Sequence, residues 1–154
     1  MNNSIVQVLT AFCTSMYIWE TACMATSHLE ERWSGDEALC DRLEILLDMQ
    51  EDWLRGIYRK FCLPDIDPGE DMTIGDPPEY DPEHFEIQKI AEESGAATAE
   101  VRQALLHRKQ GRIAVRGHEV IEYHLRQVGS EWRLENRRTH YDLAGNVVQD
   151  HDSL

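Results

Sequence analysis

The chain has 154 residues, of which 42% are hydrophobic, and its 29 acidic and 15 basic residues give a formal net charge of -14. This length favours one compact domain, and four Trp, five Tyr and three Phe supply core residues that a disordered acidic tail lacks. No stretch reaches the roughly 18 apolar residues of a membrane helix. The Met-Asn-Asn-Ser start lacks a basic region, so we expect no secretory signal.

The excess negative charge lies in the first 94 residues. They hold 21 acidic and six basic residues, whereas residues 95–154 hold eight and nine. Such a separation makes one side of a domain strongly negative, which speeds encounter with a basic partner and repels nucleic acid and anionic lipid. The charge pattern therefore favours a protein that binds a basic protein.

Two amphipathic helices are predicted in the first 60 residues. Apolar side chains recur at three- and four-residue steps over residues 4–27, and Ser4 can serve as an N-cap. A second helix is expected over residues 36–60, after a break at 28–35. Its inward positions should be Leu39, Leu43, Leu46, Leu47, Trp53, Leu54, Ile57 and Phe61, and its outer face Asp41, Glu44, Asp48, Glu51 and Asp52.

An acidic loop is predicted next, because all five prolines fall between Pro64 and Pro82. Proline removes a backbone donor and is excluded from helix interiors and central strands. Loops of this length are usually functional or disordered, with a solvated loop as the alternative. The acidic residues of this stretch are Asp65, Asp67, Glu70, Asp71, Asp76, Glu79 and Asp81.

From residue 85 onward the pattern alternates with period two. Strands are predicted at 85–92, 97–108, 118–128 and 131–141, with a connection at 109–117 that includes a short strand, 113–115, and a polar tail at 142–154. Expected inward residues are Ile121, Tyr123, Leu125, Trp132 and Leu134, and expected outward residues include His124, Arg133, Glu135 and Arg137. Helices followed by strands predict a single α+β domain over residues 1–154, with the helices packed on a strongly curved antiparallel sheet.

The last hairpin resembles the nuclear-transport-factor-2-like fold, a cone-shaped α+β domain. The residues that carry this resemblance are Tyr123, Leu125, Gly129, Trp132 and Leu134. The first helix, in turn, resembles immunity proteins of bacterial polymorphic-toxin systems in its Met-x-x-Trp-Glu segment. The residues concerned there are Phe12, Met16, Trp19, Glu20 and Cys23.

This resemblance implies a non-catalytic protein that binds and neutralises a cognate toxin domain in the cytoplasm, without a cofactor. Many toxins of such systems act on nucleic acid and have basic surfaces, which agrees with the charge pattern. The contact residues we expect are acidic and lie on the second helix and in the loop: Asp48, Glu51, Asp52, Asp65, Asp67, Glu70, Asp71, Asp76 and Glu79.

The alternative is an enzyme of the isomerase or dehydratase kind, or a small-molecule binder, that uses the apolar pocket of the cone. Such an enzyme needs an inward acid or base, and the candidates are His107, His124, His140 and Tyr123, although Tyr123 also suits an ordinary core. A homodimer through the sheet face is compatible with both functions.

Neither metal binding nor disulfide bonding is expected from the residue spacings. The seven histidines do not show zinc-site spacing, and the loop lacks the calcium-loop pattern. The four cysteines contain no Cys-x-x-Cys pair, which favours free thiols in a reducing cytoplasm.

Overall fold

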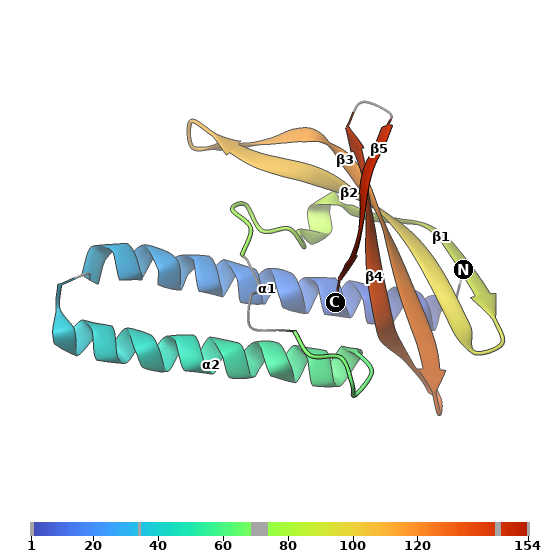
Figure 1. Ribbon diagram of the computed structural model, residues 1–154, viewed down its shortest axis with the longest axis horizontal. Helices are drawn as coiled ribbons and strands as arrows, with labels where there is room; N and C mark the ends of the chain where they lie inside the picture. The colour runs from blue at the N-terminus through green and yellow to red at the C-terminus, as the bar shows by residue number, and fades with distance from the viewer. Residues whose placement is uncertain (1, 34, 69–73, 144–145, 154) are drawn as a thin grey trace.

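The computed structural model describes residues 2–33, 35–68, 74–143 and 146–153, and it confirms the α+β class (Figure 1). Two helices come first, and a meander of strands follows. The elements in chain order are α1 (Asn3–Trp33), α2 (Glu37–Phe61), the short 3-10 helix η1 (Pro82–His84), β1 (Phe85–Glu93), β2 (Ala96–Lys109), β3 (Arg112–Val128), β4 (Glu131–Leu143) and β5 (Asn146–Ser153).

The two helices form an antiparallel hairpin with defined ends. Asp36 caps α2, its side chain accepting a hydrogen bond from the Leu39 N–H at 3.2 Å. α1 runs past the predicted break to Trp33, because no proline or glycine occurs before Gly35, which has φ of +103°. Although α1 has 31 residues, no described helix is apolar enough over a membrane-spanning length to cross a bilayer.

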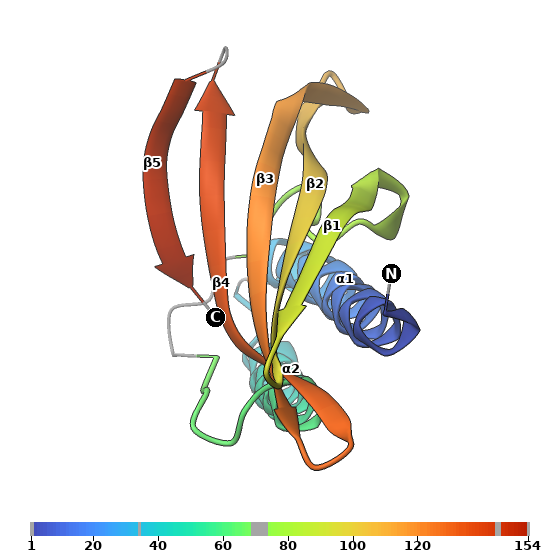
Figure 2. The same ribbon diagram turned by 90° about the vertical axis from the view of Figure 1, so that its right-hand side faces the viewer.

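The described strands form one antiparallel sheet in the order β1-β2-β3-β4-β5, side by side in Figure 2. Two predictions were wrong here. The expected connection at 109–117 belongs to a long β2–β3 arm, since Gln110 and Gly111 both have positive φ and make a tight turn. The expected polar tail forms β5, which pairs with the edge of β4.

α1 crosses one face of this sheet, and α2 contributes mainly its C-terminal third to the core. Phe12 makes edge-to-face contacts with Tyr58, Phe61 and Tyr80 at centroid distances of 6.1, 6.0 and 5.9 Å. The expected inward residues of β3 and β4 are buried. The core consists mainly of Ile5, Leu9, Met16, Trp19, Leu54, Ile57, Ala99, Val101, Ile121, Tyr123, Leu125, Trp132 and Leu134.

A bulge in β4 reverses which side chains of that strand face inward. Leu125 pairs with Leu134 and His124 with Asn136, so Glu135 is the extra residue. Before the bulge Leu134 faces the core, and after it Arg137 does, with 9% of its surface exposed. The prediction that Arg137 faces outward was therefore wrong, because period-two alternation assumes an unbroken ladder.

Candidate functional site

The α1–α2 hairpin projects beyond the sheet, which covers only one of its ends (Figure 1). Between Glu37 and Trp53, the sole buried residue of α2 is Leu43, all of these positions being described. The expectation that Leu46, Leu47 and Trp53 pack inward was wrong: they are 36%, 45% and 41% exposed. The pattern indicated an apolar face, but in the projecting part the described elements bury only Leu43 of that face.

Two kinds of side chain divide the exposed surface of this projecting helix. At 100° per residue, an apolar flank and an acidic flank lie on either side of the buried face. The apolar flank comprises Ile45, Leu46, Met49 and Trp53, all exposed. The acidic flank comprises Asp41, Glu44, Asp48, Glu51 and Asp52, all exposed.

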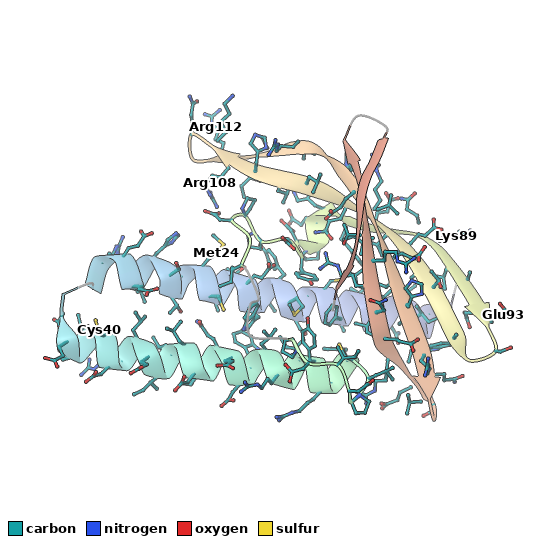
Figure 3. All side chains as sticks on the ribbon, in the orientation of Figure 1. Met24, Cys40, Lys89, Glu93, Arg108 and Arg112 are labelled. Atoms are coloured by element: carbon teal, nitrogen blue, oxygen red, sulfur yellow. The ribbon has the colours of Figure 1, made fainter. Side chains whose placement is uncertain are left out.

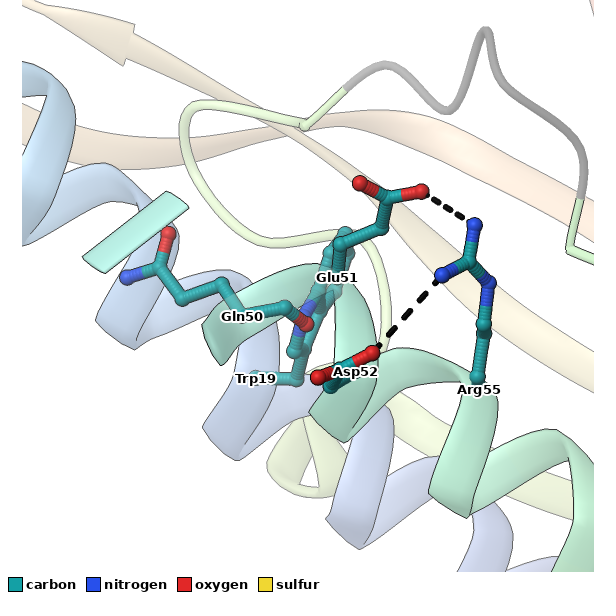
Figure 4. Close-up of polar contacts among 5 residues, drawn as sticks. All are labelled: Trp19, Gln50, Glu51, Asp52 and Arg55. Atoms are coloured by element: carbon teal, nitrogen blue, oxygen red, sulfur yellow. Dashed lines mark hydrogen bonds and ion pairs between the residues drawn. The ribbon is translucent and has the colours of Figure 1, made fainter. Parts of the chain in front are cut away.

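Three predicted contact residues belong to the acidic flank. Glu51 and Asp52 lie 2.5 and 3.7 Å from guanidinium nitrogens of Arg55 (Figure 4), so one cation offsets part of their charge. Asp48 forms no ion pair with any residue the structure describes. These are exposed pairs, which contribute little to stability and leave the carboxylates available to a partner.

The predicted loop residues do not gather in one place. Asp65 and Asp67 are exposed after α2, whereas the segment 74–81 passes on the other side of α1 (Figure 1). Asp76 is engaged by Arg108 of the β2–β3 arm at 3.0 Å, and the arm residue points toward this segment (Figure 3). Glu79 is exposed. Glu70 and Asp71 lie outside the described residues.

Glu20 holds the 75–80 segment against α1. Its buried carboxyl group, 2% exposed, accepts a hydrogen bond from the Tyr80 N–H at 3.2 Å, and the N–H groups of Gly75 and Glu79 also donate to it. Burial raises the pKa of Glu20 to about 7, against the lowering effect of these donors. Trp19, its neighbour, donates from Nε1 to the Gln50 carbonyl of α2 at 2.8 Å. Both residues of the Trp-Glu motif thus make internal contacts.

Beneath that segment lies a cavity of about 260 Å³ against the inner face of the sheet. Arg137 of β4, Glu119 of β3 and Gln103 of β2 point into it, and Glu79 borders it. Sequence reasoning missed Glu119, although it shares the alternation of Ile121 and Tyr123. Arg137 could not be assigned without the bulge. The cavity wall is therefore mixed polar and apolar, not the apolar cone interior that was expected.

Three of the four acid–base candidates, His107, His124 and Tyr123, do not line this cavity. His124 faces outward as predicted, with Nε2 2.8 Å from Glu122 Oε1 at an angle unsuited to a hydrogen bond. Tyr123 is fully buried, its hydroxyl 3.8 Å from Cys13 Sγ, and burial raises the pKa of Tyr123 well above its ordinary value. His107 Nδ1 has no hydrogen-bond partner in the structure as described. The side chain of the fourth candidate, His140, is not among the described parts of the structure.

Across the described ranges, no group of three or more His, Cys, Asp or Glu side chains is placed to hold a metal ion. None of the four described cysteines is in a disulfide bond: Cys13, Cys23 and Cys62 are buried, and Cys40 is exposed. Comparison of the chain with protein-family models, with curated proteins and with solved structures finds no match.

Proposed function

We propose that the protein is a cytoplasmic immunity protein that binds and neutralises a basic bacterial toxin domain without catalysing a reaction. The observation that carries this proposal is the exposed surface of the projecting part of α2, where an apolar flank lies beside an acidic one. A helix whose outer surface stays in contact with solvent normally has polar side chains over all of that surface.

Each flank supplies what a protein–protein contact requires. Trp53 and Met49 belong to residue types enriched at the centres of interfaces, where a partner can bury them. Asp48, Glu51 and Asp52 would pair with Lys and Arg at the rim and attract the partner over a distance. The loop carboxylates Asp65, Asp67, Glu70, Asp71 and Glu79 would extend this attraction.

Within this proposal the domain is a cone of the nuclear-transport-factor-2-like type. Two helices on one face of an antiparallel meander support it, as do bulges in β1, β3 and β4, which bend and twist a sheet. A homodimer through the outer face of the sheet stays a prediction.

The test is co-expression with the product of the gene immediately upstream, scored by growth and by co-purification at a fixed ratio. Rescue of growth together with a stable complex is the expected result. An upstream product that is not toxic and forms no complex would contradict the proposal.

Two charge-matched variants then locate the surface. Replacing Asp48, Glu51 and Asp52 by Lys should slow association by roughly tenfold or more. The control replaces Glu83, Glu86 and Glu93 by Lys, with the same change of net charge, at exposed positions outside α2. Cys40, near the hairpin tip, and Glu93 lie at opposite ends of the molecule (Figure 3). Equal effects of the two variants would place the interface elsewhere.

The second candidate function is a small-molecule enzyme or binder, and the polar cavity favours it. An inward carboxyl group and an inward guanidinium in one cavity are the features that such a protein needs. A failed co-expression test combined with ligand binding in this cavity would favour this candidate over the first.

A further inference from the structure

The cavity beneath the 75–79 segment is lined by charged side chains whose hydrogen-bonding capacity is only partly used within the protein. Arg137 is the first. Its Nη1 donates to the Tyr80 hydroxyl at 2.7 Å, and its Cζ lies 5.0 Å from the centre of the Tyr80 ring. Its buried Nε has no hydrogen-bond partner in the structure as described.

Arg137 also forms no ion pair within 4.0 Å of a carboxylate that the structure describes, although Glu79 and Glu119 are close enough to influence it. A guanidinium that is nine-tenths buried without a carboxylate partner is costly. Arg137 lines the cavity, and its guanidinium has more N–H donors than the one that bonds to Tyr80.

Glu119 supplies the opposite charge. It is 7% exposed, lines the same cavity, and makes no hydrogen bond or ion pair to any side chain in the described ranges. Gln103 stands directly opposite it on β2 and is 3% exposed. Burial raises the pKa of Glu119, and Arg137 lowers it. The cavity therefore has a donor pole at Arg137 and an acceptor pole at Glu119 and Gln103.

We infer that this cavity binds a small zwitterion of the size of an α-amino acid. Its carboxylate would accept hydrogen bonds from Arg137, and its ammonium group would donate to Glu119 and the Gln103 carbonyl oxygen. A simple anion would be repelled by Glu79 and Glu119, and a simple cation by Arg137. At about 260 Å³, the cavity is just below the roughly 300–1,000 Å³ range of ligand sites.

The inference develops the second candidate function and does not depend on the partner-binding proposal. None of the residues that line the cavity belongs to α2. A variant that loses ligand binding should therefore still rescue growth in the co-expression test, and the two ideas can fail separately.

The experiment is titration of the intact ¹⁵N-labelled protein with glycine, L-alanine, L-serine and L-glutamine, alongside sodium acetate and methylammonium chloride. At least one amino acid should move the Arg137 Nε–H signal and raise the melting temperature. Acetate and methylammonium, each offering one pole, should bind at least tenfold more weakly. No response to any amino acid, or an equal response to acetate alone, overturns the inference.

Variants of each pole test the assigned roles. Glu119→Gln and Arg137→Lys should each weaken binding by about tenfold or more, since each removes a charge-assisted hydrogen bond. The matched control is Glu122→Gln, three residues further along β3 on the outer face, and it should bind as the wild type does. If Arg137→Lys fails to fold, Glu119→Gln decides the question. Wild-type affinity in Glu119→Gln overturns the assignment.

Discussion

Two buried charged side chains from different layers, Glu20 and Arg137, hold the same stretch of chain. Glu20 on α1 accepts from the backbone N–H of Tyr80, and Arg137 on β4 donates to the hydroxyl of Tyr80. Buried charges are tolerated only where hydrogen bonds compensate them. The 75–80 segment therefore serves as the polar link between helix and sheet.

The raised pKa of Glu20, about 7, makes stability depend on pH. Because the folded state favours the neutral carboxyl group, its stabilising contribution is complete below the unfolded pKa of about 4.5 and is lost as the pH rises through 7. The free energy of unfolding, measured with urea, should therefore fall over this range relative to that of Glu20→Gln. A constant difference between the two proteins from pH about 4 to about 8 would contradict this prediction.

Removing the Tyr80 hydroxyl should destabilise the fold. Tyr80→Phe takes away the acceptor of Arg137 Nη1 and leaves a buried donor unsatisfied, at a cost of about 1–3 kcal/mol. Tyr17→Phe, in a half-buried tyrosine of α1, is the control and should change the unfolding free energy by much less. Chemical denaturation compares the two, and equal stabilities would show that this hydrogen bond contributes nothing net.

At the scale of elements, the close fit of the 75–80 segment depends on a glycine. A Cβ at position 75 would lie 2.9 Å from Glu79 Cγ and 2.9 Å from the Pro77 carbonyl oxygen. Gly56 in α2 is the opposite case, because nothing lies within 4 Å of a Cβ there. One glycine is required by packing, and the other weakens an exposed helix turn.

Alanine at these two positions should therefore act in opposite directions. Gly75→Ala should lower the unfolding free energy by about 1–3 kcal/mol through overpacking. Gly56→Ala should raise it by roughly 0.5–1 kcal/mol, since alanine has the higher helix propensity. Urea denaturation of both variants measures the two signs, and stabilisation by Gly75→Ala would show that the segment shifts freely.

At the scale of the whole molecule, the sheet covers one end of the helical hairpin and leaves the other end exposed (Figure 1). The exposed end carries the acidic flank, and the chain as a whole has a formal net charge of -14. Surface charges act over about 10 Å in 0.1 M salt, so they influence encounter more than the final contact.

The rate of association with the proposed basic partner should consequently fall by about tenfold or more from low to high salt. Replacing Met49 and Trp53 of the apolar flank by Ser should instead speed dissociation and leave the salt dependence of association unchanged. Stopped-flow mixing separates the two rates. An association rate that does not change with salt would remove the steering role.

The sequence by itself determined the two helices, most strands and the side-chain alternation of Ile121, Tyr123 and Leu125, because these follow from local periodicity. The exposure of Asp48, Glu51 and Asp52 could also be predicted, since charged residues of a helix rarely become buried.

Only the tertiary structure decided which apolar helix face is covered, where Arg137 points, and that Gln103, Glu119 and Arg137 line one cavity. Exposure of Trp53 depends on where the sheet ends, and the orientation of Arg137 on one extra residue in β4. Both depend on pairings between residues distant in the chain, which local patterns do not encode.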